Sequence, residues 1–194
     1  MIKAVDLVIV PDEILFQRSL EANRSLVSPG IELGKRHTIP HISLCMAMIE
    51  ESNIPVACEE IKGALSGIKI DTLTIEKIYQ HGINTVGWTF KKDSWLIHLQ
   101  QTVETILKKY HVPVAPQAFD CFANLKYGDP AGALLYVNQF FEQYGGSQYE
   151  PHITLGRGEL SPVHHHIGDT FEGGKIALYH LGSSCTCEKL LENF

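Results

Sequence analysis

PHISL at residues 40–44 and PHITL at residues 151–155 are two copies of one five-residue pattern, one in each half of the 194-residue chain. Each copy opens a run of strand-forming residues. Because alternate side chains of a strand share a face, the histidine and the hydroxyl of each copy would lie side by side, with the isoleucine and leucine facing the core. The duplication therefore predicts two related halves, each contributing one imidazole and one hydroxyl to a common site.

The polar positions of the repeat, His41, Ser43, His152 and Thr154, suit chemistry on a phosphodiester. Two imidazoles flanking one pocket can act as general base and general acid, because a pKa of about 6.5 leaves both protonation states populated near neutrality. The hydroxyls can donate hydrogen bonds to phosphate oxygens as charge develops. This chemistry needs neither a metal nor another cofactor. A structural role is the alternative, but packing would constrain the apolar positions of the repeat rather than the polar ones.

Apolar runs and turn residues predict the order β-α-β-α-β-β for the first half of the chain. The expected strands cover residues 3–10, 41–49, 70–78 and 85–90, the last two joined by a turn around His81 and Gly82. One helix follows Pro11 and ends at residues 28–30. A second begins near Ser52 or Asn53 and ends near Gly67, with Ile54, Cys58, Ile61 and Leu65 on one face.

The second half opens with the strongest helical pattern, over residues 93–110, where apolar side chains recur every three or four positions: Trp95, Leu99, Val103, Ile106 and Tyr110. Asp129 and Pro130 predict the start of another helix that ends at Gly145 and Gly146, with Ala133, Val137, Phe140 and Tyr144 inward. Strands are expected at 152–157, 174–181 and 185–191. Residues 112–128 form a long loop, either contacting nucleotide bases near the cleft or serving as a partly buried connector.

Composition and charge limit the classes of protein that the chain can represent. A hydrophobic share of 44% and a charged share of 20% are typical of a globular protein. The net charge of −6 argues against an extended face for nucleic acid. The apolar N-terminal run is interrupted by Asp6, and no stretch approaches the roughly 18 apolar residues of a membrane helix. Five cysteines without a CxxC pair favour a reduced, cytoplasmic setting, and a monomer is the default expectation.

The paired motifs resemble the H-x-[ST]-hydrophobic signatures of the two-histidine (2H) phosphoesterase superfamily, which includes the LigT-like RNA 2′,3′-cyclic phosphodiesterases, also called 2′-5′ RNA ligases. Motif separation, chain length, element order and the C-terminal segment LYHLGSSCTCEKLLENF (178–194) agree with this resemblance. It implies an α+β, bilobal, pseudo-twofold fold, with two antiparallel β-sheets lining a central cleft and helices on the outside. Residues 1–194 would form a single domain of two intertwined lobes, with one motif in each.

The resemblance also implies a metal-independent enzyme that opens the 2′,3′-cyclic phosphate of an RNA end or a nucleotide to a 2′-phosphate. One of His41 and His152 would activate water and the other would protonate the leaving oxygen, while Ser43 and Thr154 bind the phosphate. The sequence does not assign the two histidine roles. A reverse, ligase-like reaction fits the same site, and RNA ends, small cyclic nucleotides and ADP-ribose cyclic phosphate all remain open as substrates.

Two further residues adjoin the second motif. Arg157 is a candidate for binding the substrate phosphate or a neighbouring phosphate, with a surface ion pair as the alternative. Tyr149 is a candidate for stacking on a base or for a hydrogen bond to a phosphate oxygen, with a place in the cleft wall as the alternative.

Other histidines and cysteines are assigned no function. His164, His165 and His166 are adjacent and point in different directions, so an exposed, solvated turn is favoured over a metal site. Cys185 and Cys187 are predicted to lie on one face of a strand as a dry pair of small apolar residues.

Two other functions compete with the phosphodiesterase hypothesis. A nucleotide-binding module that has lost catalysis would bind its ligand without turnover, although the intact histidines argue against it. A metal hydrolase using some of the ten histidines would be sensitive to EDTA, although few carboxylates lie at ligand spacing near the motifs.

Overall fold

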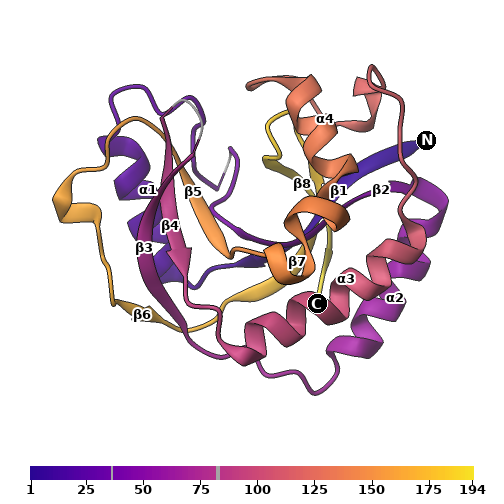
Figure 1. Ribbon diagram of the computed structural model, residues 1–194, viewed down its shortest axis with the longest axis horizontal. Coiled ribbons are helices and arrows are strands. Elements are labelled where there is room, and N and C mark those ends of the chain that lie inside the picture. The colour runs from indigo at the N-terminus through magenta and orange to yellow at the C-terminus, as the bar shows by residue number, and fades with distance from the viewer. Residues whose placement is uncertain (36, 82–83) are drawn as a thin grey trace.

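Two four-stranded antiparallel sheets form the centre of the computed structural model, which describes residues 1–35, 37–81 and 84–194 (Figure 1). The first sheet has the order β2-β1-β7-β8, with β1 at Ile2–Val10, β2 at Ile42–Glu50, β7 at Lys175–Leu181 and β8 at Cys187–Asn193. The second has the order β5-β4-β3-β6, with β3 at Leu73–His81, β4 at Thr85–Phe90, β5 at His152–Arg157 and β6 at Thr170–Phe171. The predicted α+β class with two antiparallel sheets is confirmed.

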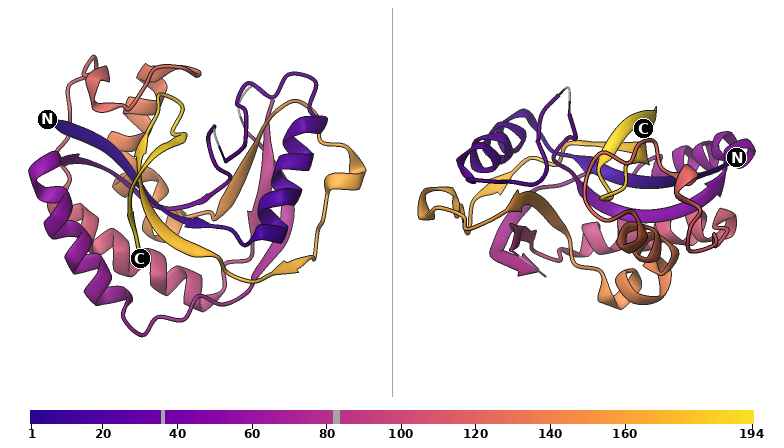
Figure 2. Two further views of the ribbon diagram at one scale, coloured as in Figure 1. Left: turned by 180° about the vertical axis from the view of Figure 1, so that it is seen from behind. Right: turned by 90° about the horizontal axis from the view of Figure 1, so that it is seen from above.

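The longer helices lie outside the sheets (Figures 1 and 2). They are α1 at Glu13–Ser25, α2 at Ile54–Leu65, α3 at Ser94–Tyr110 and α4 at Pro130–Asn138. Shorter turns are η1 at Glu51–Asn53, η2 at Phe119–Cys121, η3 at Phe140–Tyr144, η4 at Gly146–Gln148 and η5 at Pro162–His164. Helix α1 follows a strand of the first sheet but packs against β5 of the second, whereas α3 follows a strand of the second sheet but packs against β2 of the first. The two halves of the chain are therefore interleaved.

One continuous hydrophobic core joins the two sheets and the helices. Helix α3 illustrates how the sequence produces it, because Leu99, Val103 and Ile106 are buried as their spacing predicted. Fully burying a leucine of this kind contributes about 1.5–3 kcal/mol, so this apolar stripe accounts for much of the attachment of α3 to β2. No helix in the described ranges is both long enough and apolar enough to cross a membrane.

Several predicted boundaries differ from the observed ones. The strand expected at 70–78 runs from Leu73 to His81, so His81 belongs to β3 and not to the predicted turn. Residues 82 and 83 of that turn lie outside the described residues. The helix expected from Asp129 to Gly146 remains an α-helix only to Asn138 and continues as the wider π-turn η3. Strand β6 was not predicted, because two residues carry no readable alternation.

The prediction for the cysteine pair was wrong. Strand β8 begins at Cys187, and Cys185 lies in the preceding turn with φ at 54°. That turn is closed by a hydrogen bond from the Cys185 N–H to the Gly182 carbonyl at 3.0 Å. The two thiols therefore do not share a strand face. All five cysteines, every one within the described ranges, are free thiols.

Each motif strand is an edge strand, and each carries a bulge at the same motif position. In β2, Ser43 pairs with Val8 and Cys45 with Leu7, so Leu44 is the extra residue. In β5, Thr154 pairs with Gly87 and Gly156 with Val86, so the corresponding residue is Leu155. Bulges bend an edge strand and re-aim its side chains, and here they directly follow the motif hydroxyl.

Helix α1 holds the second bulge in place. The buried Asn23 amide donates to the Leu155 carbonyl at 2.7 Å and to the Ile31 carbonyl at 3.1 Å, and its own oxygen accepts from the Leu33 N–H at 3.2 Å. Because Leu155 has no partner residue on β4, its carbonyl depends on this side chain. Asn23 thus connects α1, the 31–33 segment and the second motif strand.

Candidate active site

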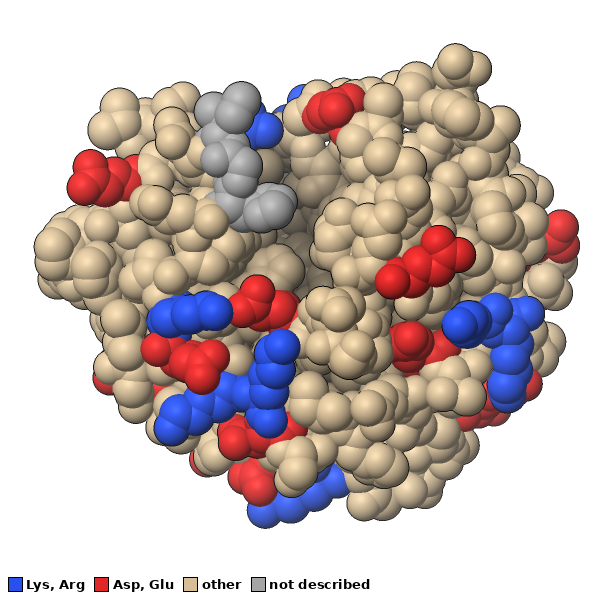
Figure 3. Space-filling model, viewed as in Figure 1, with Lys and Arg blue, Asp and Glu red and all other residues tan. Residues whose placement is uncertain are grey.

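The two motif strands meet at a cavity of about 550 Å³. Its walls include His41 and Ser43 from the first motif and His152 and Thr154 from the second. Strands β2 and β5 are in contact, although they belong to different sheets. In Figure 3 the surface is hollowed between the two halves of the molecule. The structure thus brings together all four polar residues of the repeat.

Both imidazoles are held by the same kind of backbone contact. Nδ1 of His41 lies 2.8 Å from the carbonyl of Ile39, and Nδ1 of His152 lies 2.8 Å from the carbonyl of Glu150. A carbonyl only accepts hydrogen bonds, so Nδ1 is the donor in each ring. In each neutral ring, Nε2 is therefore the nitrogen that can accept a proton.

Burial controls the charge of His41. Its side chain is 17% exposed, and Nε2 lies 3.8 Å from a carboxylate oxygen of Asp6. Loss of hydration lowers the pKa of His41 to about 4, aided by the nearby His152 and partly opposed by the backbone hydrogen bond to Ile39. The imidazole of His41 is consequently neutral near neutral pH and can accept a proton.

Ser43 is hydrogen-bonded to a residue that sequence reasoning missed. Its Oγ lies 2.6 Å from Oδ2 of Asp6, and it donates to that oxygen when the carboxyl is ionised. Asp6 is fully buried in β1, and burial raises its pKa well above the ordinary value, although the hydrogen bond to Ser43 opposes the shift. The signal in the sequence was an acidic residue inside an otherwise apolar strand, which we treated only as an interruption.

Thr154 has a corresponding partner, Tyr79, which the sequence analysis also missed. The two hydroxyl oxygens are 2.6 Å apart, and the Tyr79 ring meets the His152 ring edge-on with centroids 5.0 Å apart. Tyr79 reaches β5 by crossing β4 at Gly87, where a Cβ atom would lie 2.1 Å from the Ile153 carbonyl and 2.3 Å from the Tyr79 ring. Burial raises the pKa of Tyr79 to about 12, so the phenol keeps its proton.

Arg157 and Tyr149 also line the cavity. Arg157 is exposed, takes part in none of the ion pairs among the described residues, and borders an adjoining hollow of about 860 Å³ as well. Tyr149 is only 3% exposed, which leaves its ring no open face for stacking on a base. Its buried hydroxyl has no hydrogen-bond partner in the described part of the chain. A polar contact is therefore the remaining functional prediction for Tyr149.

The histidine run at 164–166 is half-buried rather than solvated, which corrects the expected exposed turn. The Trp88 indole donates to the His164 carbonyl at 2.9 Å, and the His166 ring packs edge-on against Trp88. Nδ1 of His166 also lies 3.2 Å from Asp169, which is paired with Arg18. These contacts attach the segment to β4 and α1.

The loop at residues 112–128 is a connector. All of these residues are described, and none of them lines the cavity. Cys121 and Phe122 are buried, and the Ala123 N–H donates to the Leu181 carbonyl at 2.8 Å. The alternative in which this loop contacts nucleotide bases has no support in the cavity lining.

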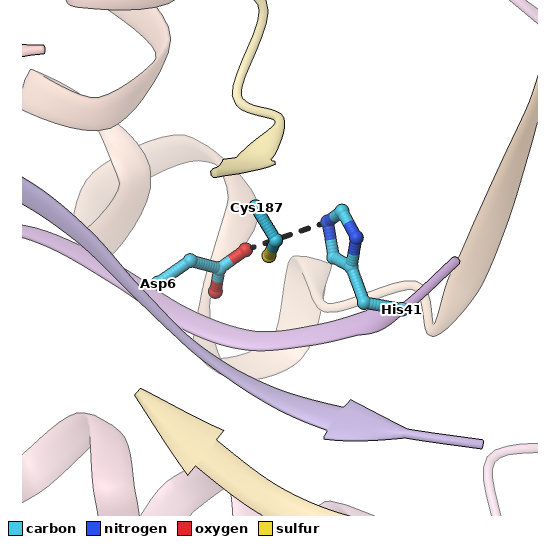
Figure 4. Close-up of side chains that lie close together, drawn as sticks. All are labelled: Asp6, His41 and Cys187. Carbon is cyan, nitrogen blue, oxygen red and sulfur yellow. Dashed lines mark ion pairs between the residues drawn. The ribbon is translucent and has the colours of Figure 1, made fainter. Parts of the chain in front are cut away.

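Asp6, His41 and Cys187 form the one group in the described ranges whose donor atoms all lie within 4.8 Å of one another (Figure 4). A carboxylate, an imidazole and a thiolate can together hold a divalent ion. Here, however, burial raises the pKa of both the Cys187 thiol and the Asp6 carboxyl, so an ion would have to displace a proton from each. It would also occupy the imidazole nitrogen that acid-base chemistry requires. We assign no metal to this group.

Neither the protein-family models nor the curated proteins match this sequence. Solved structures do match, and the chain has the fold of E. coli LigT and of a further phosphoesterase, which is the fold that the motifs predicted. A crystal structure of a phosphoesterase is 12% identical and covers 99% of this chain and 97% of its own, with a TM-score of 0.58. Apo LigT from E. coli is also 12% identical, and the match covers 100% of this chain and 96% of the LigT chain with a TM-score of 0.59. E. coli LigT in complex with 3′-AMP is 12% identical as well, and the match covers 100% of this chain and 98% of the LigT chain with a TM-score of 0.60.

Proposed function

We propose that this chain is a metal-independent cyclic phosphodiesterase that opens the 2′,3′-cyclic phosphate of an RNA end or a nucleotide to a 2′-phosphate. The observation that carries the proposal is the pair of imidazoles in one cavity, each oriented by a backbone carbonyl and each accompanied by a hydroxyl. A one-step displacement at phosphorus needs two such groups, because one proton must leave the attacking water and another must reach the departing oxygen.

His41 is the base in this proposal, because burial keeps its imidazole neutral. Its Nε2 takes a proton from water while the water oxygen bonds to phosphorus. The bond from phosphorus to the 3′ oxygen breaks, and protonated His152 gives its proton to that oxygen. One water is consumed, and the products are a 2′-phosphate and a 3′ hydroxyl. Proton exchange with solvent then restores both imidazoles.

Ser43, Thr154 and Arg157 bind the substrate phosphates in this proposal, and the Tyr149 hydroxyl contacts a phosphate oxygen. Every residue invoked comes from one chain, so the reaction needs no partner subunit. A cavity of about 550 Å³ suits a nucleotide-sized ligand. E. coli LigT has been crystallised with 3′-AMP, with ATP and with phosphate, which supports the same ligand class here.

The surface charge favours a short substrate over a long nucleic acid. On the face shown in Figure 3, acidic and basic side chains are intermingled, and the hollow between the halves is mostly uncharged. With a net charge of −6, the protein lacks the broad positive field that binds a phosphate backbone. Contacts would therefore be concentrated on the terminal phosphate.

The test is hydrolysis of 2′,3′-cyclic nucleotides and of an oligonucleotide ending in a cyclic phosphate, in EDTA, with the products separated to distinguish 2′- from 3′-phosphates. We expect turnover to a 2′-phosphate, and a loss of about 10²–10⁴-fold in His41→Ala and in His152→Ala. His98→Ala, which removes an exposed histidine on α3, is the matched control and should retain full activity.

Each other outcome points to a different function. Activity that EDTA abolishes would favour a metal hydrolase, and tight binding of the product without turnover would favour a binding module. Joining of a cyclic-phosphate end to a 5′ hydroxyl, with little hydrolysis, would favour the ligase reaction. Full activity in both histidine variants would rule out the two-histidine mechanism.

A further inference from the structure

We propose that Asp6 is a positioning residue that works as a neutral acid: its carboxyl O–H donates to Ser43 and so directs the Ser43 hydroxyl hydrogen at the substrate phosphate. Tyr79 does the same for Thr154 in the other half of the cleft. This inference deepens the proposed function and takes its site as given. Neither Asp6 nor Tyr79 belongs to the repeated motif.

The argument begins with the single hydrogen of a serine hydroxyl. Ser43 Oγ and Asp6 Oδ2 are 2.6 Å apart, so one of the two groups donates to the other. If Asp6 is ionised, Ser43 must donate to it and has no hydrogen left for a phosphate oxygen. If Asp6 carries the proton, Ser43 accepts from it and its own hydrogen can point into the cavity. Only the second arrangement lets Ser43 donate a hydrogen bond to substrate.

The surroundings of Asp6 favour the neutral form. Its side chain is fully buried, and Oδ1 has no hydrogen-bond partner among the described residues. An ionised carboxylate with one unpartnered oxygen is costly to bury, whereas the carbonyl oxygen of a neutral acid tolerates this better. Loss of hydration raises the pKa of Asp6 in the same direction.

No lysine or arginine in the described ranges forms an ion pair with Asp6. The titratable groups that face it are His41, Cys45, Tyr136, Tyr149, Cys185 and Cys187. Burial raises the pKa of each of these thiols and phenols and lowers that of the imidazole, so all of them favour their neutral forms. An ionised Asp6 would therefore have no fixed counter-charge, and it would repel the anionic substrate.

Tyr79 supplies the equivalent donor in the second half. Its phenol oxygen lies 2.6 Å from Thr154 Oγ1, and with a pKa raised to about 12 it remains a donor at neutral pH. Thr154 can then accept from Tyr79 and donate to the phosphate, as Ser43 does opposite. The two motif hydroxyls are thus oriented by different residue types, which explains why the sequence repeat does not extend to the residues behind them.

Carbon-13 labelling of aspartate carboxyls tests the protonation state without any need for turnover. In the 194-residue chain we expect one carboxyl signal to keep the chemical shift of a protonated acid at neutral pH, and Asp6→Asn to remove that signal. If every aspartate carboxyl titrates in the ordinary acid range, Asp6 is an anion and the proposal is overturned. This measurement decides the point even if cyclic phosphates prove not to be substrates, in which case the proposed function fails separately.

Activity tests the positioning role. Asp6→Asn keeps an uncharged donor of the same shape, so kcat should stay within about threefold of the parent, whereas Asp6→Ala should lower kcat by about tenfold or more. Any loss of activity that comes from Asp6 ionisation should be missing in Asp6→Asn, so that the high-pH limb of this variant reports the general acid His152 alone. Asp120→Asn, an exposed carboxyl on η2, is the matched control and should keep the parent pH profile. Equal kcat values for the two Asp6 variants would overturn the role.

Two further comparisons separate positioning from simple packing. In a Ser43→Ala background, Asp6→Asn and Asp6→Ala should give the same kcat, because the hydroxyl that Asp6 orients is gone. Tyr79→Phe should lower kcat by about tenfold with little change in KM, whereas Tyr110→Phe, which removes a hydroxyl bonded to Glu60, should not. A Tyr79→Phe enzyme with parental kcat would contradict the proposal for the second half.

Discussion

At the scale of individual residues, burial decides which side chains in the cleft carry a charge. It lowers the pKa of His41 to about 4, raises that of Tyr79 to about 12 and raises that of Asp6 well above its ordinary value. Each shift favours the neutral form of its group. The anionic phosphate would therefore enter a site with few charges of its own, where hydrogen-bond donors are worth more than they are in water.

The pH dependence of kcat/KM follows from the shift at His41. A base must be deprotonated, and a lowered pKa keeps His41 deprotonated to lower pH. The acid limb of the profile should therefore fall well below the ordinary histidine value of 6.5, toward about 4. The measurement is kcat/KM for a 2′,3′-cyclic nucleotide from about pH 3.5 to 8, which reports the free enzyme. An acid limb at or above the ordinary value would show that His41 is not the neutral base.

Arg157 should affect long substrates more than short ones. It is exposed at the cavity and also lines the adjoining hollow, where the next phosphate of an oligonucleotide could lie. Arg157→Ala should raise KM for a cyclic-phosphate-ended oligonucleotide by about tenfold, the value of one charge-assisted hydrogen bond, and should change KM for a mononucleotide less. Arg24→Ala, at an exposed position on α1, should change neither. Equal effects of Arg157→Ala on both substrates would place its contact at the cyclic phosphate itself.

At the scale of the elements, the site is made by paired irregularities in two edge strands. Leu44 in β2 and Leu155 in β5 are each the extra residue of a bulge, directly after the motif hydroxyl. The strand next to β5 also lacks a side chain at Gly87, where Tyr79 crosses toward Thr154. Regular strands with a Cβ at every position could not bring these groups together.

Gly87→Ala should therefore be costly. The added Cβ would meet a backbone oxygen at 2.1 Å, which cannot move without disturbing β5, and would also displace the Tyr79 ring. We expect a loss of about 2–3 kcal/mol in the free energy of unfolding, measured by urea denaturation, together with reduced kcat. Gly63→Ala is the control: nothing lies within 4 Å of the new Cβ on α2, so stability should rise by about 0.5–1 kcal/mol. Parental stability in Gly87→Ala would show that β4 and β5 can separate freely.

For the whole molecule, the important feature is that both sheets share one core. Helices α1 and α3 each follow one sheet in the chain and pack on the other, so neither sheet is complete without the other half. The cavity lies where the two sheets meet, and its walls include residues from the first motif at 41–43 and the second at 152–154. A single-domain organisation remains a prediction that this shared core supports.

Cooperative unfolding tests that prediction. Trp88 is buried in β4 of the second sheet, whereas circular dichroism reports on the helices that cover both sheets. In a Trp95→Phe variant, Trp88 is the remaining tryptophan, and its fluorescence and the circular dichroism should give coincident urea transitions. Two separated midpoints would show that the halves unfold independently.

The sequence by itself determined the strands other than β6, the main helices and the four motif residues. These depend on local signals: strand-forming runs in β2 and β5, helical spacing in α3, the cap at Asp129 and a repeated five-residue pattern. Such signals are read within a few neighbouring residues, because side-chain periodicity follows directly from backbone geometry. Boundaries depend more on tertiary contacts: β3 and β8 both begin later than the sequence predicts.

Only the tertiary structure decided what surrounds those residues. Asp6 reaches Ser43 across 37 positions of sequence, and Tyr79 reaches Thr154 across 75. Neither pairing has a local pattern, because it depends on strand order, on register and on the bulges that shift it. The same holds for the buried surroundings that set the pKa of His41, since burial is a property of the packed molecule. The sequence therefore named the candidate reacting groups, and the tertiary structure determined the neutral state of His41 and the hydrogen-bond partners of Ser43 and Thr154.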